Sequence, residues 1–401
     1  MAPTTCITQT VPADPLQAVI HADPFPYYAA LRARAPIVRD EALKLWIAAR
    51  AHTVRAVLDN ERLTVRPTSE PVPRAIAGQP AGEVFARLAR MNEGAGHRIA
   101  RQALVAGLSA VDGATVFQSA RKHAASTIER FNTDDAALLD VLAFALPVRV
   151  IAELVGLSAP NGLEATVRQF VACLSPTSTP EALRDAHDAA SRLQTQLYAL
   201  TRNATAGSAL VERIVAGGLA REIELPNALV SNLLGLFSQT FDATAGLIGN
   251  GVVTLARHAN VAARLAASPS DIHAFIREVA RFDPPVHNTR RFARETVCIE
   301  GVAVQSGDCV LVLLAAASRD EAVFEDAERF VLDREAHPLP GFGAGRHACP
   351  GETIAQAIAA GIVAELVASE FDFANPALRW TYRPSLNSRI PKFAFVERNA
   401  S

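Results

Sequence analysis

The sequence predicts a mainly α-helical protein with a small β region, organised as a single domain over residues 1–401. Apolar residues make up 50% of the chain and charged residues only 20%, so it can bury a large core. Alanine-rich stretches with helical spacing run through most of the chain, and no internal repeat or flexible linker interrupts them. The β signals are fewer and shorter, which favours a small sheet beside a helical body.

The first predicted helix covers residues 27–34 and is opened by Asp23-Pro24, a helix-opening pair. Further predicted helices follow in chain order over residues 53–59, 96–108, 114–131, 146–155, 180–201 and 270–281. The predicted strands are 44–48, 297–304 and 310–314, with a tight turn at 305–308 between the last two.

The longest periodic element starts after Pro226 and continues without proline to about His258. At 1.5 Å per residue this is about 45 Å of helix, enough to cross the molecule. Apolar residues supply its faces, but its middle carries polar residues where a fully buried helix normally stays apolar. These central polar residues are Gln239, Thr240, Asp242 and Thr244. Their position predicts a ligand or water site.

The charge and the chain start exclude several classes of protein. A formal charge of −2 gives no general attraction to phosphate backbones, so nucleic acid is not an expected partner. The N-terminus lacks the basic region and apolar core of a signal peptide. The longest apolar stretches fall short of the roughly 20 residues that span a bilayer. We therefore expect a cytoplasmic protein with no membrane span.

The sharpest local signal is the segment 341–351, Gly-Phe-Gly-Ala-Gly-Arg-His-Ala-Cys-Pro-Gly. Its glycines lack a Cβ, so the backbone can turn tightly and approach a flat object closely. Cys349 stands just before a predicted helix, whose positive end stabilises a thiolate, and Arg346 and His347 add positive charge. A thiolate ligand to haem iron favours O–O cleavage. The other four cysteines lack such a setting, and their scatter favours no disulfide framework.

The loop matches the signature FGxGxHxCxG in every defined position, and the chain therefore resembles the cytochrome P450 family, in its bacterial, soluble, class I type. The matching residues are Phe342, Gly343, Gly345, His347, Cys349 and Gly351. The resemblance implies the P450 fold, a long central helix crossing the haem, and haem b (iron protoporphyrin IX) as the cofactor. It makes Cys349 the axial metal ligand and His347 a contact of a haem propionate. A glycine-rich turn around a buried cysteine is the competing interpretation.

Two further segments agree with the resemblance. Glu278 and Arg281 have the ExxR spacing, and Arg329 lies in a Glu-Arg-Phe segment that looks like a later family motif. The resemblance implies that these three residues form a buried ion-paired triad that supports the cysteine loop. ExxR alone is weak, because charged pairs three residues apart are common on solvated helix faces.

Haem carries two propionates, which need cationic donors in a buried pocket. His97 and Arg101 match the family's HxxxR pair, and Arg291 matches the arginine that follows the Pro-Pro-Val segment. With His347 this gives four expected donors. Taken singly, His97 and Arg291 are equally well explained as surface residues.

The central helix departs from the family pattern A-G-x-[D/E]-T-T, in which an acid and the first threonine relay protons to dioxygen at the haem. Asp242 aligns with the acid, and Gln239 and Thr240 align with the A-G pair. Ala243 stands at the first threonine and Thr244 at the second, so the usual hydroxyl is missing. A positioned acid or base contributes about 10²–10⁴-fold to such a step.

Three explanations remain open for the missing hydroxyl. A hydroxyl on the substrate completes the relay; or Thr240, Thr244 or Gln239 replaces it together with ordered water; or the oxidation depends less on that relay. The last class includes C–C or C–O coupling, desaturation and peroxide-driven chemistry. We favour the first two jointly.

The resemblance also maps a substrate pocket that is mostly apolar, with scattered hydroxyls and amides. Its expected contacts are Phe237, Phe241, Val286, Asn288, Leu386 and Asn387. A medium-sized, mainly hydrophobic substrate with one or two polar handles, natural-product or terpenoid-like, fits such a pocket. Asn288 and Asn387 are equally well explained as asparagines that stabilise turns.

No flavin- or nicotinamide-binding fingerprint and no iron–sulfur cysteine spacing is present in the sequence. We therefore expect electrons to come from separate proteins. The resemblance implies a monooxygenase, expected to be monomeric, that uses dioxygen and takes electrons from a ferredoxin or flavodoxin and its reductase. Arg98, Arg101 and Arg346 suggest a basic docking patch. The rival from another class is a haem-thiolate sensor that binds ligands without turnover.

Overall fold

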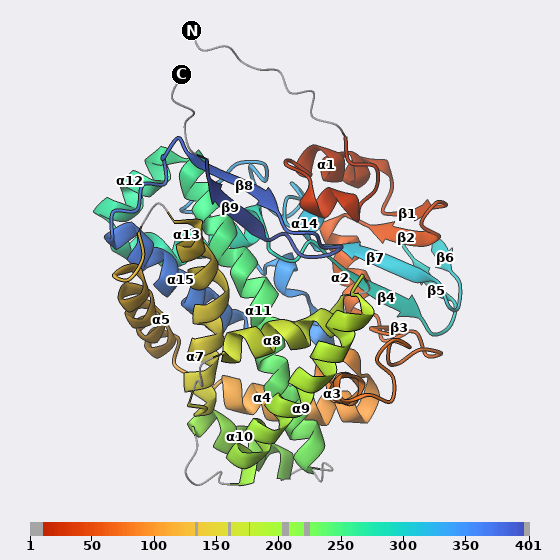
Figure 1. Ribbon diagram of the computed structural model, residues 1–401. Helices are drawn as coiled ribbons and strands as arrows, with labels where there is room; N and C mark the ends of the chain where they lie inside the picture. The colour runs from red at the N-terminus through yellow and green to blue at the C-terminus, as the bar shows by residue number, and fades with distance from the viewer. Residues whose placement is uncertain are drawn as a thin grey trace.

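The computed structural model describes residues 11–132, 135–158, 162–175, 177–202, 208–219 and 225–396. A body of helices lies beside a smaller region of strands (Figure 1). The α-helices are α1 (Phe25–Arg34), α2 (Ala51–Asp59), α3 (Pro80–Arg87), α4 (Gly94–Leu108), α5 (Gly113–Ile128), α6 (Ala136–Asp140), α7 (Leu146–Val155), α8 (Leu163–Val171), α9 (Pro180–Arg202), α10 (Ala209–Leu219), α11 (Leu225–Arg257), α12 (Ala259–Ala267), α13 (Ile272–Phe282), α14 (Leu314–Ala317) and α15 (Glu352–Ala368).

Short helical turns connect several of these elements. They are η1 (Gln17–Ile20), η2 (Ala89–Met91), the π-helical turn η3 (Val141–Ala145), η4 (Ala172–Leu174), η6 (Pro269–Asp271), η7 (Pro340–Phe342) and η8 (Gly345–His347). The strands are β1 (Ile37–Asp40), β2 (Leu45–Ala48), β3 (Leu63–Thr64), β4 (Asn288–Ala293), β5 (Val297–Ile299), β6 (Val302–Val304), β7 (Cys309–Leu313), β8 (Leu378–Tyr382) and β9 (Pro391–Phe395).

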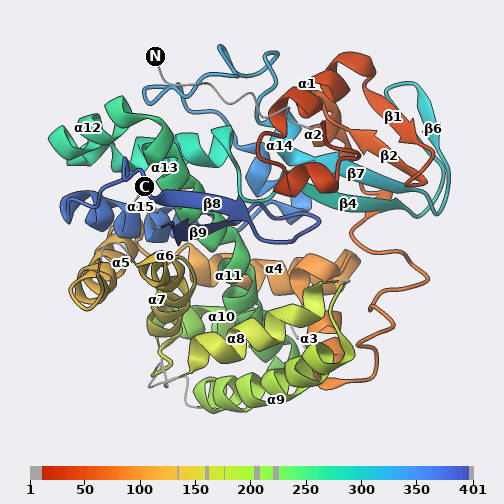
Figure 2. The ribbon, with the colours of Figure 1, turned by 45° about the horizontal axis from the view of Figure 1, so that its top comes forward.

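Helix α11 is the axis of the molecule. Its 33 residues correspond to about 50 Å. It contacts α12 and α13 towards one end, α7 and α15 along its length, and α3, α8 and α9 towards the other (Figures 1 and 2). The prediction of one long helix from after Pro226 to about His258 is confirmed; the helix begins two residues earlier, at Leu225, and ends one residue earlier, at Arg257.

The main sheet has five strands in the order β1-β2-β7-β4-β3. All neighbours are antiparallel except β2 and β7, which are parallel with Trp46 opposite Val310. The hairpin β5–β6 turns through Glu300 and Gly301, both with positive φ, as a tight two-residue turn requires. The predicted small β region is confirmed, and β4, which follows directly on the Pro-Pro-Val segment, is an additional strand.

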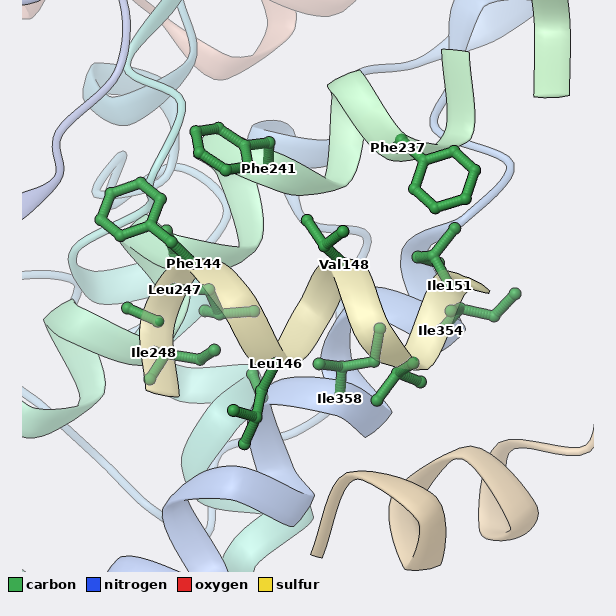
Figure 3. Close-up of a cluster of buried hydrophobic side chains, with 14 of the residues drawn as sticks. Phe144, Leu146, Val148, Ile151, Phe237, Phe241, Leu247, Ile248, Ile354 and Ile358 are labelled. Atoms are coloured by element: carbon green, nitrogen blue, oxygen red, sulfur yellow. The ribbon is translucent and has the colours of Figure 1, made fainter. Parts of the chain in front are cut away.

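The largest apolar core fills the helical body, where α7 and η3 pack against α11 and α15 (Figure 3). Two smaller cores lie around the main sheet, one towards α2 and one towards α1. This arrangement holds the segment that precedes α15 against both α2 and α4.

None of the helices in the described ranges is by itself long and apolar enough to cross a membrane. One bent pair, α4 with α5 at 72° to each other, meets the length and composition requirement together.

Candidate active site

Cys349 lies between η8 and α15, in a loop that folds back on itself. Its backbone N–H donates a hydrogen bond of 2.8 Å to the carbonyl of Phe342. Burial raises the pKa of the Cys349 thiol, and a hydrogen bond from the Gly351 backbone opposes that shift. Yet the cysteine side chain is exposed to solvent. The Cys349 residue is thus accessible to solvent, while nearby protein atoms partly desolvate its thiol.

The glycines of this loop serve its packing against neighbouring segments. Gly343 and Gly345 have positive φ, +73° and +64°. A Cβ on Gly345 would lie 2.4 Å from Oδ1 of Asp59 in α2, so the loop reaches α2 only with glycine here. A Cβ on Gly351 would meet nothing within 4 Å. The close approaches that the structure shows are therefore to protein, and the expected approach to a flat ligand stays a prediction.

Glu93, the residue before α4, organises the polar groups beside the loop. Its carboxylate lies 2.8 Å from Nε of Arg346 and 3.1 Å from Nε2 of His347. Burial would raise the pKa of Glu93, but the hydrogen bonds to His347 and Arg346 lower it to about 2. Glu93 was not among the site residues predicted from the sequence. Its position four residues before His97 was the one sequence feature that pointed to it.

His97 lies against His347, with ring centroids 4.2 Å apart. Its Nδ1 and Nε2 lie 2.8 Å and 3.0 Å from the carbonyl oxygens of Ala89 and Arg346. Both ring nitrogens of His97 thus face the backbone, and the residue links η2 to the cysteine loop.

Two buried nitrogen atoms near the cysteine loop have no hydrogen-bond partner in the described part of the chain, Nδ1 of His347 and Nε of Arg291. Other nitrogens of the same side chains are engaged: Nε2 of His347 lies 3.1 Å from Glu93, and Nη1 of Arg291 donates to the carbonyl of Arg290 at 2.9 Å. Burial lowers the pKa of Arg291 to about 10. Arg101 donates from Nη1 to the carbonyl of Ala348 at 2.7 Å, which leaves its other N–H groups. An accessible thiol with the unpartnered nitrogens of Arg291 and His347 nearby fits an iron porphyrin, which needs one axial ligand and donors for two carboxylates.

The ion-paired cluster around Glu278 corrects one sequence prediction. Arg281 binds the Glu278 carboxylate through two N–H groups at 2.7 and 2.8 Å, as expected. Arg329 is not the third member: its side chain is 74% exposed and pairs with Asp326. Instead, Nε of Arg334 lies 3.2 Å from both Glu278 oxygens. The backbone carbonyl of Arg329, rather than its guanidinium, turns inward and accepts from Arg281.

Phe237 and Phe241 are buried in the structure, and their expected contact with substrate stays a prediction. They are 0% and 3% exposed. Their rings point towards Phe144, Val148 and Ile151 of η3 and α7 (Figure 3). The helix period alone could not show this, because α11 is apolar on more than one face.

The opposite face of α11 carries Gln239 and Ala243, which are one turn apart and about half a turn from Phe237 and Phe241. Gln239 is exposed and donates to the Gly235 carbonyl of its own helix at 3.0 Å. Thr244 lies two turns after Phe237 and so shares the core face; its Oγ1 is buried without a partner. Thr244 is therefore wrongly placed to replace a hydroxyl at residue 243.

Asp242 is half-buried beside this face. Burial raises the pKa of its carboxyl, and the positive charges of Arg168, Arg383 and Arg90 oppose the shift. Thr240 is half-buried and makes no hydrogen bond through its side chain to the described residues. Both can exchange protons or hydrogen bonds with a bound molecule.

Of the two asparagines proposed as substrate handles, only Asn288 binds the backbone through its side chain in the structure. Asn288 donates from Nδ2 to the carbonyl of Leu386 at 2.8 Å, and Val286 forms a β-bridge with Ser388. The Asn387 side chain is exposed, while its carbonyl accepts from the backbone of His287. The alternative, turn-stabilising interpretation is thus confirmed for Asn288.

The expected basic docking patch is smaller than predicted. Arg346 is half-buried, pairs with Glu93 and donates to the carbonyls of Asn60 and Leu63. Of the three arginines in that prediction, only Arg98 is exposed.

Comparison with known proteins agrees with this geometry. The family model described as cytochrome P450 matches residues 272–377, the segment that holds the Glu278 cluster and the cysteine loop. Cytochrome P450 107B1 of Saccharopolyspora erythraea is 34% identical over 55% of this chain and 54% of its own length. The chain thus spans about half the length of this curated relative.

Two other proteins match over most of the chain. Cytochrome P450 monooxygenase PikC of Streptomyces venezuelae is 28% identical over 84% of this chain and 81% of its own. The crystal structure of CalO2 has a TM-score of 0.82 at 23% identity and covers 96% of this chain and 99% of its own, which shows the common fold. In its cysteine loop, its Glu278 cluster and these matches, the chain is similar to cytochrome P450s, and it shares their fold.

Proposed function

We propose that this protein is a haem-thiolate monooxygenase that oxidises a medium-sized, mainly hydrophobic small molecule. The observation that carries the proposal is the accessible, desolvated thiol of Cys349 beside the unpartnered donors of Arg291 and His347. The relative from Streptomyces venezuelae is named a monooxygenase, which supports the same reaction class.

The residues around the cysteine loop would hold haem b. Cys349 would bind the iron, and Arg291, His347 and Arg101 would bind the propionates. Glu93 fixes the ring of His347 through Nε2 and so leaves Nδ1 as the free nitrogen. When bound, haem supplies a redox-active iron whose thiolate ligand favours cleavage of the O–O bond.

Proton delivery would depend on Asp242. Because burial raises the pKa of this carboxyl, it retains a proton nearer to neutral pH and can pass it on through water. Ala243 offers no hydroxyl on the same helix face. A hydroxyl of the substrate, or Thr240 with ordered water, would complete the path.

Electrons would come from a separate ferredoxin or flavodoxin with its reductase. Ala243 favours a second candidate within the same fold, an oxidation that depends less on proton relay, such as C–C or C–O coupling or desaturation.

The test is reconstitution of the purified holoenzyme with a ferredoxin and its reductase. Compounds that shift the ferric haem from low to high spin are supplied with labelled dioxygen. We expect substrate-dependent consumption of reductant and labelled oxygen in the product. Coupled or desaturated product without the label would indicate the second candidate. Ligand binding with no product at all would contradict both and identify a sensor.

A further inference from the structure

Arg90 is held by a rigid backbone between the central helix and the site histidines. It is the middle residue of η2, directly before α4. The N–H of Ala89 donates to Oδ1 of Asn232 in α11 at 2.8 Å, and the Ala89 carbonyl lies 2.8 Å from Nδ1 of His97. Nδ2 of Asn232 also donates a hydrogen bond of 2.9 Å to the carbonyl of Arg87. The position of the Arg90 backbone is therefore fixed.

The Arg90 side chain has no partner despite this fixed support. It forms no hydrogen bond or ion pair with any residue of the described ranges, and its Nε is inaccessible to solvent. The rest of the side chain keeps intermediate exposure. Taking part of a guanidinium out of water without a hydrogen-bond partner is unfavourable. Such a group usually meets its counter-charge in a ligand or another molecule.

Neighbouring arginines do have carboxylate partners. Arg168 donates to Glu164 at 2.9 Å, and Arg383 donates to both oxygens of Asp140 at 2.8 and 2.9 Å. The charges of Arg168, Arg383 and Arg90 all lower the pKa of Asp242, and of these three only Arg90 has no carboxylate partner among the described residues.

The charge of Arg90 interacts with groups other than those of the cysteine loop. Burial lowers its pKa, and the groups that oppose this are Cys173 of η4 and Asp242 of α11. The donors expected to hold the propionates interact with other groups: Arg291 with Arg346 and Glu93, and Arg101 with Cys349. Arg90 therefore belongs to the Asp242 side of the site and is separate from that set.

Asp242 does not satisfy Arg90. No oxygen of Asp242 lies within 4.0 Å of an Arg90 nitrogen, and burial holds the Asp242 carboxyl towards its neutral form. Leu88, two residues before Arg90, is fully buried, and Cys173, whose charge acts on Arg90, is nearly so. One cation among apolar walls is the usual composition of a site that orients an amphipathic small molecule.

We propose that Arg90 binds an anionic group, a carboxylate or a phosphate ester, at one end of a mainly apolar substrate. The guanidinium fork matches both groups in geometry. The proposal rests on the proposed function and names its substrate class. It places the anion near Asp242 and η4, with the apolar part of the molecule left to reach the face of α11 that carries Gln239 and Ala243.

The test is a spectral titration of the ferric holoenzyme, which reads binding through the spin state and needs no turnover. The probes are decanoate, decyl phosphate and decanol, with naphthoate, naphthyl phosphate and naphthol as an aromatic series, at neutral pH. The variants are Arg90→Gln, Arg90→Lys and Arg87→Gln. Arg87 is the matched control, because its side chain pairs only with Glu83 on the surface of the same helix.

We expect wild type to bind at least one anionic probe ten-fold or more tightly than the neutral probe of the same series. Arg90→Gln should lose this preference while its affinity for the neutral probe changes less than two-fold. Arg90→Lys should retain part of the preference, and Arg87→Gln all of it. If Arg90→Gln does not hold haem, Arg90→Met takes its place. The comparison of carboxylate with phosphate identifies which anion is preferred.

The proposal is overturned if no anionic probe binds wild type more tightly than its neutral counterpart, or if the preference survives in Arg90→Gln. Either result leaves the proposed function standing when neutral probes still shift the spin state and are oxidised. If the protein binds no haem, the proposed function fails instead, so the two failures are distinguishable.

Discussion

Nε of Arg334 lies 3.2 Å from both carboxylate oxygens of Glu278, and only 11% of the Arg334 side chain is exposed. Glu278 is thereby held from two sides, by Arg281 on its own helix and by Arg334 from the segment after β7 and α14. A buried carboxylate between two guanidiniums ties α13 to the chain that leads into the cysteine loop. This connection fixes the support on which Cys349 rests.

Arg334 and Arg329 provide a matched pair of variants. Arg334→Met removes a partner of a buried carboxylate, so we expect the free energy of unfolding to fall by about 3 kcal/mol and haem content to fall with it. Arg329→Met removes an exposed pair and should cost less than about 0.5 kcal/mol. Urea unfolding of both variants checks this. Equal losses would contradict the assignment of Arg334 to the cluster.

Gly345 and Gly351 test the packing of the loop. Gly345→Ala forces a side chain into left-handed backbone, at roughly 1–2 kcal/mol, and also displaces the Asp59 carboxylate. We expect a loss of at least about 2 kcal/mol in unfolding free energy and weaker haem retention. Gly351→Ala meets open space and keeps its N–H, so it serves as the control. A Gly345→Ala protein as stable as the control would show that the loop does not need this close approach to α2.

His287 makes stability depend on pH. It is fully buried, with Nδ1 2.9 Å from the Tyr28 hydroxyl, and it faces Asp283, Arg389 and Arg319. Burial lowers its pKa from 6.5 to about 4. Between these values the unfolded chain binds the proton and the folded protein does not. Stability is therefore complete above pH 6.5 and falls as the pH drops towards 4, by about 3 kcal/mol.

Urea unfolding at neutral pH and near pH 4.5 measures this effect. His287→Gln should be less stable than wild type at neutral pH but should lose less stability on acidification. His52→Gln, which alters an exposed histidine, should follow wild type. An acid loss of the same size in His287→Gln would assign the effect to other groups, such as Glu93, whose pKa of about 2 acts in the same direction at lower pH.

Ala243→Thr tests what completes the proton path. The added hydroxyl lies on the face of α11 that carries Gln239, and we expect haem content to be unchanged. If a substrate hydroxyl already serves, the coupling of reductant to product should not rise. Thr240→Ala is the companion variant and should lower coupling if Thr240 contributes. A large increase in coupling in Ala243→Thr would rule out the substrate hydroxyl.

The elements with strong periodicity or a dense motif could be predicted from the sequence: α11 and the loop around Cys349 are where they were expected. Side-chain direction could not be predicted. Arg329 and Arg334 are the same residue type five positions apart, and only the turn of the backbone decides which guanidinium reaches Glu278. Phe237 likewise lies on a helix with several apolar faces, so its spacing does not tell core from pocket.

The unpartnered groups were also beyond sequence reasoning. Arg90 stands between a predicted loop and a predicted helix, and nothing in its neighbours indicates that its charge stays unpaired. Glu93 belongs to no motif that was considered, yet it fixes both Arg346 and His347. Both roles arise from segments that are distant in sequence and meet only in the fold.

The central claim is that Cys349 supplies the thiolate ligand of a bound haem. The most direct measurement is the absorption spectrum of the reduced protein with carbon monoxide, for wild type, Cys349→Ala and the exposed-cysteine control Cys298→Ala. We predict the Soret band typical of thiolate ligation in wild type and in Cys298→Ala, and its loss in Cys349→Ala. A Cys349→Ala protein that kept this band would contradict the account.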